Sequence, residues 1–368
     1  MKVPREYDLI LQGATGFTGR MAADELAKHA PPFFRWAIAG RSEERLKPIA
    51  EKHGVPFLVA DASDPEAMSH LAARTKAVIS CAGPFAVFGT PLVDACVEQA
   101  THYADLTGEL PWMQKLINKH HEHCAERGIT LIPASGFDSV PTDLCVHDFL
   151  RELNEKGLAD GETAPPISGF YFVRGGFNGG TLHSGIALAE AGHSLKPAEM
   201  KTGRVPSLKR WFAPFLMAPV NEAIVQRTHQ LENRMASYRE FMLCKSRGEA
   251  VFLNTALKVI SSLMGSRFGR FLFKRFGPKP GEGPSLEKIE AGFANLTLLA
   301  GPLESPALTQ SYAWSGDPSN LITTRCLVQT GLALAADEAQ RGGVLTPASA
   351  LGDKLFQRLK NIDAVRTI

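Results

Sequence analysis

The sequence YDLILQGATGFTG, residues 7–19, gives the clearest indication of how this chain folds. A mostly apolar run leads into a turn with glycines at 13, 16 and 19, which is typical of a β-strand that passes directly into a helix. In that setting Gly13 permits a tight turn, Gly16 lets the backbone approach a pyrophosphate, and Gly19 lets strand and helix pack closely. The stretch therefore predicts a dinucleotide-binding βαβ unit, although glycines in such a turn also occur for structural reasons alone. The residues expected to hold the phosphates are Gly13, Thr15, Gly16, Phe17, Thr18 and Gly19.

The same alternation of strand and helix continues to about residue 156. Short β-rich runs occupy residues 7–12, 35–40, 56–60, 77–81, 102–105 and 130–133. Amphipathic, helix-like segments lie between them, at residues 19–29, 43–53, 65–74, 90–99, 111–127 and 141–156. Such alternation is typical of a parallel sheet with helices on both faces. We therefore expect a Rossmann-type, doubly wound α/β domain over residues 1–156.

A polar stretch rich in Gly and Pro, residues 157–166, predicts a linker into a second domain. Residues 167–174, 237–245, 290–300 and 307–315 read as longer strands of a mostly antiparallel sheet, with helical stretches at 180–191 and 249–276. These elements predict an α+β domain over residues 165–316. Residues 320–368 turn helical again, with a helix start at Pro347, and by analogy with other doubly wound domains we expect them to complete the first domain.

Composition excludes several classes of protein. The 368 residues carry 40 Lys and Arg against 38 Asp and Glu, a formal net charge of +2, which argues against nucleic-acid binding. Six cysteines without CxxC spacing indicate reduced thiols and a cytoplasmic location. His120, His121, His123 and Cys124 fall within one helix and do not share a face, so we expect no metal site. The N-terminus lacks a signal peptide, and no apolar run is long enough to span a bilayer.

The end of the second strand indicates which dinucleotide binds. NAD-binding domains usually place an acidic residue there to hold the ribose 2′-hydroxyl. This chain has AGRS at residues 39–42, so Arg41 and Ser42 are available to a 2′-phosphate, and we expect NADP(H). A surface role for Arg41 is the alternative. Asp61, at the end of the third strand, would reach the adenine side or cap the next helix. After the fourth strand, the loop expected beside the nicotinamide consists of Cys81, Ala82, Gly83 and Pro84.

Several motifs together resemble one family. They are GATGFTG, AGRS, the loop CAGPF, YADLTGE at residues 103–109, GFDSVPTD at 136–143, GGTLHS at 179–184 and GVLTPASALG at 343–352. The chain resembles the saccharopine dehydrogenase-like oxidoreductases, above all the branch of the trans-acting enoyl reductases, and the similarity weakens between about residues 195 and 285. The resemblance implies an NADP-binding Rossmann domain joined to an α/β substrate domain. It also implies reduction of lipid-like acyl chains for glycolipid assembly.

Three groups of residues are candidates for the chemistry. No tyrosine is followed by Lys four residues later, which excludes the mechanism of short-chain dehydrogenases. Asp138 and Ser139 precede a helix after the sixth strand, and His183 lies in a glycine-rich turn of the second domain, so these are the catalytic candidates. Asp105 and Glu109, after the fifth strand, form a third group. Helix capping would explain Asp138 or Ser139 equally well, and a structural role would explain His183.

One stretch suggests contact with lipid. Residues 250–280 contain no acidic residue but six basic ones, interleaved with Phe, Leu and Ile, and residues 209–219 have a similar mixture. Such segments suit the headgroup boundary of an anionic membrane or a tunnel for an acyl chain, although an ordinary amphipathic helix gives the same spacing. We therefore expect either a lipid-like substrate or peripheral contact with the inner face of a membrane.

The leading hypothesis for function is an NADP(H)-dependent oxidoreductase that reduces a lipid-like or enoyl-type acyl substrate. A catalytically silent nucleotide-binding scaffold on lipid surfaces is the second hypothesis. A small-molecule dehydrogenase of the amino-acid type is the third, and the apolar character of residues 211–276 argues against it. A homodimer stays among the candidate assemblies, because the sequence does not define the oligomeric state.

Overall fold

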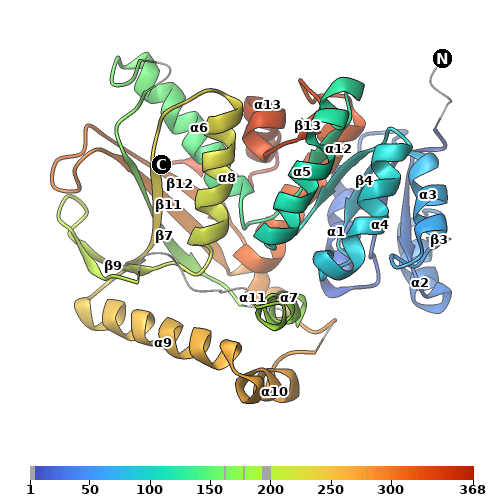
Figure 1. Ribbon diagram of the computed structural model, residues 1–368, viewed down its shortest axis with the longest axis horizontal. Coiled ribbons are helices and arrows are strands. Elements are labelled where there is room, and N and C mark those ends of the chain that lie inside the picture. Colours follow the sequence, from blue (N-terminus) through green and yellow to red (C-terminus); the bar gives the residue numbers. More distant parts are fainter. Residues whose placement is uncertain (1–4, 161–162, 177–178, 193–199, 280) are drawn as a thin grey trace.

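Two β-sheets form the framework of the molecule, one in each half of the view in Figure 1. The computed structural model describes residues 5–160, 163–176, 179–192, 200–279 and 281–368. The sheets lie side by side, with helices α6 (Val140–Glu155) and α8 (Ala218–Leu231) between them in this view. Both the parallel Rossmann-type sheet and the mostly antiparallel second sheet were expected, and the fold class is confirmed.

The first sheet has the strand order β3-β2-β1-β4-β5-β6-β13, and every neighbouring pair is parallel. Its strands are β1 (Tyr7–Gln12), β2 (Trp36–Gly40), β3 (Phe57–Val59), β4 (Thr75–Ser80), β5 (His102–Asp105), β6 (Thr130–Ile132) and β13 (Gly343–Val344). The order reverses between β1 and β4. Ligands of such sheets bind beyond the carboxyl ends of the strands at this reversal.

Helices cover both faces of the first sheet because its strands carry apolar residues on both sides. Leu9 and Leu11 point to one face, where they join the core formed with α1 (Phe17–His29), α2 (Glu43–His53) and α12 (Thr323–Ala335). Ile10 points to the other face, toward α3 (Pro65–Ala73), α4 (Phe85–Glu98) and α5 (Leu110–Arg127). Strands buried on both faces read as continuous apolar runs, which explains why the sequence showed them clearly.

The second sheet has the order β14-β12-β11-β7-β10-β9-β8, and only the pair β7–β10 is parallel. Its strands are β7 (Ile167–Arg174), β8 (Gly203–Val205), β9 (Arg210–Pro214), β10 (Tyr238–Cys244), β11 (Phe293–Ala300), β12 (Leu308–Ser315) and β14 (Val365–Thr367). Tyr171 of β7 points toward α6, and its hydroxyl lies 3.0 Å from that of Thr142. Phe170, the preceding residue, points to the opposite face, where it stacks on Phe241 and packs edge-on against Phe212.

The C-terminal segment joins both halves of the molecule. Helix α12 packs on the first sheet, β13 extends that sheet, and α13 (Pro347–Asn361) packs on α6. The last strand, β14, instead pairs with β12 at the edge of the second sheet. From the sequence we expected residues 320–368 to complete the first domain. Instead, they contribute to both domains.

Three helical segments differ from expectation. Helix α8 was not predicted. The single helical stretch expected over residues 249–276 is two helices, α9 (Arg247–Gly265) and α10 (Arg267–Phe276), separated at Ser266. The hydroxyl of Ser266 caps α10 by accepting the Gly269 N–H (2.9 Å), so the interruption has a local cause. The remaining helices are α7 (Gly179–Glu190) and the short α11 (Leu286–Glu290), with a π-helical turn at Pro318–Ile322.

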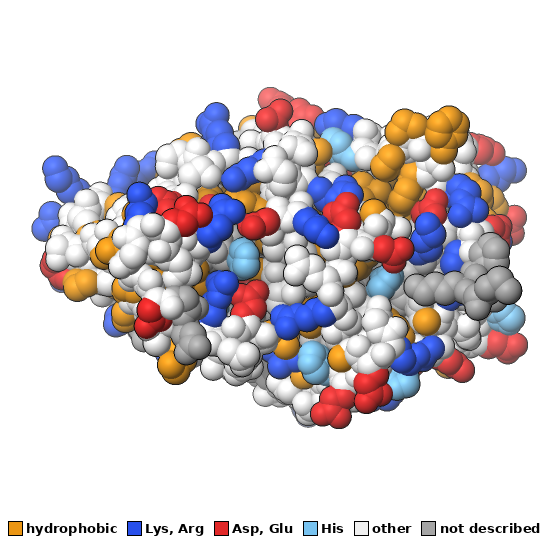
Figure 2. Space-filling model, turned by 90° about the horizontal axis from the view of Figure 1, so that it is seen from above, with side chains coloured by type: hydrophobic (Ala, Val, Ile, Leu, Met, Phe, Trp, Pro, Cys, Tyr) orange, Lys and Arg blue, Asp and Glu red, His pale blue; other side chains and the backbone are white. Residues whose placement is uncertain are grey.

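The surface seen from above the view of Figure 1 shows acidic and basic side chains intermingled over both halves of the molecule (Figure 2). No helix in the described part of the chain is long and apolar enough to cross a membrane.

Candidate functional site

The glycine turn after β1 has the geometry that a dinucleotide phosphate requires. Gly13 has φ +82°, and a Cβ there would lie 2.8 Å from the backbone nitrogen of Ala82. A Cβ on Gly19 would lie 2.1 Å from the carbonyl oxygen of Gly13, so no larger residue fits. Gly16 is the N-cap of α1 and brings no capping side chain. The first N–H groups of the helix are therefore left to an anion, as a pyrophosphate site needs.

The end of β2 leaves a cation available for a 2′-phosphate. Arg41 is exposed, and no hydrogen bond or ion pair from another described residue reaches its guanidinium. Ser42 is the N-cap of α2, and its hydroxyl accepts the Arg45 N–H at 3.4 Å. That hydroxyl still has its proton to donate to a ligand. The geometry fits NADP(H) at this end of the site.

Two arginines that we did not single out from the sequence also reach the glycine turn. Arg20 on α1 and Arg45 on α2 each donate to the carbonyl oxygen of Thr15, both at 2.9 Å. Asp61 forms a local turn in which its carboxylate accepts the backbone N–H and the hydroxyl of Ser63. These two hydrogen bonds, and then the nearby charge of Arg41, lower the pKa of Asp61. The cap of α3 is Asp64, so the alternative role considered for Asp61 is excluded.

The loop after β4 lies against the second domain. A Cβ built on Gly83 would lie 3.7 Å from the hydroxyl oxygen of Ser184 on α7, which brings α7 to the loop of residues 81–84. Burial raises the pKa of the Cys81 thiol to about 12, so this thiol is not a nucleophile near neutral pH. Phe85 is buried and stacks on Trp112, with ring centroids 5.9 Å apart. Phe85 is therefore a core residue.

The carboxylates after β5 are structural. Asp105 is buried and accepts hydrogen bonds from the Tyr103 hydroxyl and from the backbone N–H groups of Thr107 and Ala134. Glu109 is also buried, and its two oxygens accept the N–H groups of Phe85 (2.8 Å) and Ala86 (2.7 Å) at the start of α4. A carboxylate at a helix N-terminus stabilises the helix dipole. Both groups are committed to protein contacts.

Asp138 differs from these two carboxylates. Its Oδ2 would lie 3.4 Å from a Cβ on Gly108, so the side chain points to the loop that follows β5. It is half-buried, and no hydrogen bond from the described residues reaches its carboxylate. Desolvation by burial raises its pKa to about 6. A carboxyl group that is partly accessible, unpartnered and has a pKa raised toward neutrality fits a proton donor.

The surrounding backbone holds Asp138 in place. The Phe137 N–H donates to the Thr323 hydroxyl (3.1 Å), and the Ser135 N–H donates to the Asp105 carbonyl oxygen (2.6 Å). Ser139 is buried and its hydroxyl donates to the Ala134 carbonyl oxygen, which favours a structural role. His183 is half-buried on α7, one residue before Ser184. The catalytic roles of Asp138, Ser139 and His183 stay predictions.

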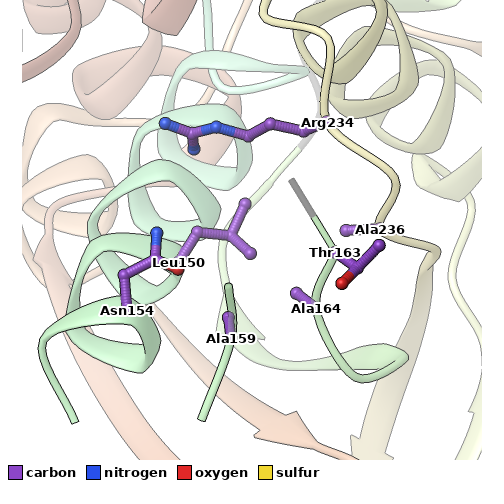
Figure 3. Close-up of a pocket in the computed structure, with 7 residues that line it drawn as sticks. All are labelled: Leu150, Asn154, Ala159, Thr163, Ala164, Arg234 and Ala236. Atoms are coloured by element: carbon purple, nitrogen blue, oxygen red, sulfur yellow. The ribbon is translucent and has the colours of Figure 1, made fainter. Parts of the chain in front are cut away.

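Two cavities lie away from the carboxyl end of the first sheet. One holds about 10 Å³, room for at most one water molecule, between α6 and the segments that lead into β7 and β10 (Figure 3). Its lining residues, Leu150, Asn154, Ala159, Thr163, Ala164, Arg234 and Ala236, include none of the predicted site residues. The other, of about 160 Å³, lies on the face of the second sheet that carries Phe170 and Phe172. In the described part of the chain no cluster of His, Cys, Asp or Glu could hold a metal ion.

A Rossmann sheet whose glycine turn fits a pyrophosphate and whose β2 end fits a 2′-phosphate, joined to a second domain, defines an NADP-dependent oxidoreductase. Residues 9–132 match the family model of the saccharopine dehydrogenase NADP binding domain, so the cofactor is NADP(H). The chain belongs to the saccharopine dehydrogenase-like oxidoreductases, in the branch of the trans-acting enoyl reductases.

Relatives support this assignment over nearly the whole chain, and solved structures share the fold. A trans-acting enoyl reductase of Mycobacterium tuberculosis is 33% identical over 98% of this chain and 97% of its own length. Another M. tuberculosis protein, provisionally given the same name, is 35% identical over 97% and 96%. Among solved structures, apo saccharopine dehydrogenase (L-Glu forming) of Saccharomyces cerevisiae has a TM-score of 0.60 at 13% identity and covers 98% of this chain and 99% of its own. Homospermidine synthase of Legionella pneumophila, solved with NAD, has a TM-score of 0.58 at 11% identity, covering 98% and 90%.

Proposed function

We propose that this oxidoreductase uses NADPH to reduce the carbon–carbon double bond of an enoyl-type, lipid-like acyl substrate. The observation that carries the proposal is the Asp138 carboxyl group, which is unpartnered within the described structure and has a pKa raised to about 6. Reduction of a double bond next to a carbonyl needs a proton as well as a hydride. The names of the relatives, trans-acting enoyl reductases, support this reaction type.

In the proposed reaction Asp138 donates the proton, and other parts of the chain bind the cofactor. When bound, NADPH supplies the hydride, which is added to the β-carbon of the double bond. The electron pair of the double bond moves toward the carbonyl group, and Asp138 donates its proton to the α-carbon. The Asp138 carboxylate then regains a proton from solvent. The glycine turn of residues 13–19 and Arg41 hold the far end of the cofactor, and α7 approaches the loop at Gly83.

A substrate of the amino-acid type fits this environment poorly. A dicarboxylate needs cationic groups at the reacting centre, and such groups would lower the pKa of a neighbouring carboxyl. The raised pKa of Asp138 has desolvation as its cause, with no opposing contribution from a Lys or Arg. An apolar, weakly charged substrate is therefore the better match.

The test is NADPH oxidation with trans-2-enoyl thioesters of increasing chain length, with the reduced product identified by mass spectrometry. Asp138→Asn should lower kcat by about 100-fold or more, because general acid catalysis contributes that much, while the Kd for NADPH stays unchanged. Asp353→Asn, on the exposed side of α13, is the matched control and should retain wild-type rates. The proposal is wrong if none of the enoyl thioesters supports NADPH oxidation by wild type while amino-acid substrates are turned over.

A further inference from the structure

The two helices α9 and α10 present an apolar surface that the described structure leaves uncovered. Phe268, Phe271 and Phe276 of α10 are 68%, 61% and 78% exposed. On α9 the exposed apolar residues are Val251, Phe252, Val259, Ile260 and Leu263. Residues at spacings of three, four, seven and eight lie on one face of a helix, so most of these form a stripe. We call these eight residues the α9–α10 surface.

The residues of this surface are not the ones that pack against the rest of the molecule. The buried residues of α9 are Ala250, Leu257 and Met264, and the buried residue of α10 is Gly269. The helices lie at the edge of the molecule, outside both sheets, with α9 next to β9 and α10 next to α7 (Figure 1). The phenylalanines therefore neither fill a core nor line one of the two cavities described above. Exposed apolar patches of this kind mark sites of interaction.

The charge of the α9–α10 surface indicates what kind of partner it binds. No acidic residue occurs from Ala250 to Gly281. Lys258, Arg267 and Arg275 are exposed and have no acidic partner among the described residues. Unpaired cations beside exposed Phe and Leu match the boundary between anionic headgroups and acyl chains, where apolar rings are buried and cations remain at the headgroups.

Two other basic residues hold the helices in place. Lys274 lies 2.7 Å from the carboxylate of Glu190 on α7, and Arg270 lies 4.0 Å from it. Arg270 also donates to the carbonyl oxygens of Met264 and Gly265 at the end of α9. These contacts fix the angle between α9 and α10 and tie both to α7. The surface is therefore preformed, which reduces the entropic cost of docking.

The segment that follows α10 contacts the start of α1, next to the glycine turn of residues 13–19. The ring of Phe17, at the start of α1, lies within 2.3 Å of where a Cβ on Gly283 would be. Arg20 of α1 donates to the carbonyl oxygen of Gly281 (3.3 Å), and the Gly179 N–H of α7 donates to that of Glu282 (3.1 Å). Docking through α9 and α10 would therefore take place close to the site of the chemistry.

We propose that the α9–α10 surface docks the enzyme on an anionic lipid bilayer. The proposal goes beyond the proposed reaction, and it can be tested without turnover. Residues 209–219, which the sequence also suggested as a membrane contact, do not contribute, because Phe212, Ala213 and Phe215 are buried. The surface is thus confined to the second of the two predicted segments.

Co-sedimentation of the full chain with vesicles tests the proposal. Vesicles of phosphatidylcholine with 30% phosphatidylglycerol should bind wild type at low salt, pure phosphatidylcholine should bind it far more weakly, and high salt should release it. The triple variant Lys258→Glu/Arg267→Glu/Arg275→Glu should lower the partition by about 100-fold or more, from the contribution of each cation near a charged surface. Phe268→Ser/Phe271→Ser should also reduce binding and should fold normally, because both rings are exposed.

A second triple variant controls for net charge. Lys28, Lys47 and Lys115 are exposed on α1, α2 and α5, so Lys28→Glu/Lys47→Glu/Lys115→Glu changes the total charge equally and should leave vesicle binding near wild type. Three outcomes would overturn the proposal. They are absence of binding to anionic vesicles at low salt, equal loss in both triple variants, and a dimer in solution that Phe268→Ser/Phe271→Ser dissociates. The last would assign the surface to a second copy of the chain.

Discussion

Asp105, Glu109 and Asp138 all lie at or beyond the ends of strands of the first sheet, yet the structure gives them different roles. The first two accept several hydrogen bonds each, which commits them to the fold. Asp138 accepts none from the described residues, and burial alone raises its pKa. Removing a polar group from water without giving it a partner costs stability, and such costs are typical of functional residues.

The pH dependence of the reaction follows from this pKa. A general acid acts in its protonated form, so kcat should be highest below about pH 6 and should fall as pH rises through the pKa of Asp138. The decline should approach tenfold per pH unit. In Asp138→Asn, which has no titrating group at this position, the residual rate should be independent of pH over the same range. A wild-type profile that is flat between pH 5 and 8 would contradict the assignment.

Arg41 should set the preference for NADP(H) over NAD(H). Arg41→Ala removes the cation placed for the 2′-phosphate and should weaken NADPH binding by about 1.5–3 kcal/mol, the range for hydrogen bonds to charged groups. Binding of NADH should change little. Titration of both cofactors by fluorescence measures the effect, and Lys47→Ala, which removes an exposed cation on α2, is the control. An unchanged preference in Arg41→Ala would mean that another group holds the 2′-phosphate.

At the scale of elements, the start of α4 depends on a side chain from outside the helix. The N-cap residue of α4 is Pro84, which offers no capping side chain, and the Glu109 carboxylate takes its place. Two backbone N–H groups, that of buried Phe85 and that of Ala86, thus rely on one carboxylate.

Glu109→Ala should therefore lower the free energy of unfolding by about 2–3 kcal/mol, because two backbone donors lose their acceptor. Glu109→Gln, which retains one acceptor oxygen, should lower it by less. Denaturant unfolding followed by circular dichroism gives both values. Exposed Glu155→Gln on α6 should have almost no effect, and an equally small change in Glu109→Ala would contradict the capping role.

The pair α9 and α10 shows what amphipathic spacing can and cannot predict. The apolar residues recur at helical intervals over residues 250–276, so helix formation was predictable. The break at Ser266 was not, because a single Gly-Ser step inside such a pattern is compatible with a continuous helix. Only the packing of both helices against α7 and β9 shows that the apolar stripe faces outward.

At the scale of the whole molecule, one hydrophobic core runs through both halves. Leu9 of the first sheet and Leu296 of the second belong to the same buried cluster, which also includes Leu144 of α6 and Leu327 of α12. The two sheets therefore share the helices that cover them. Domains that share a core in this way should not unfold separately.

The chain should consequently unfold in a single cooperative transition. Leu296→Ala, a cavity-forming change in the second sheet, should lower the free energy of unfolding by about 2–5 kcal/mol and shift the whole transition. NADP(H), which binds the first domain, should raise the midpoint for the second domain as well. Circular dichroism and tryptophan fluorescence should coincide, and two resolved transitions would show that the halves are independent.

Features that depend on neighbours along the chain were predictable from the amino-acid sequence. The glycine turn of residues 13–19 is local, since strand, turn and helix start lie within a few residues. Arg41 and Ser42 follow β2 directly, and the strands of the first sheet are apolar on both faces. For the same reason the candidate Asp138 could be placed at the carboxyl end of the sheet from its position after β6.

Which of these residues have hydrogen-bond partners, and which are exposed, follows from the folded arrangement of the chain. Glu109 meets the start of α4 more than twenty residues earlier in the chain, whereas Asp138 meets no hydrogen-bond donor within the described residues. Phe85 is buried and Phe268 is exposed although both lie on apolar helix faces. Burial and desolvation depend on neighbours in space, and those neighbours come from distant parts of the chain, so no local pattern can record them.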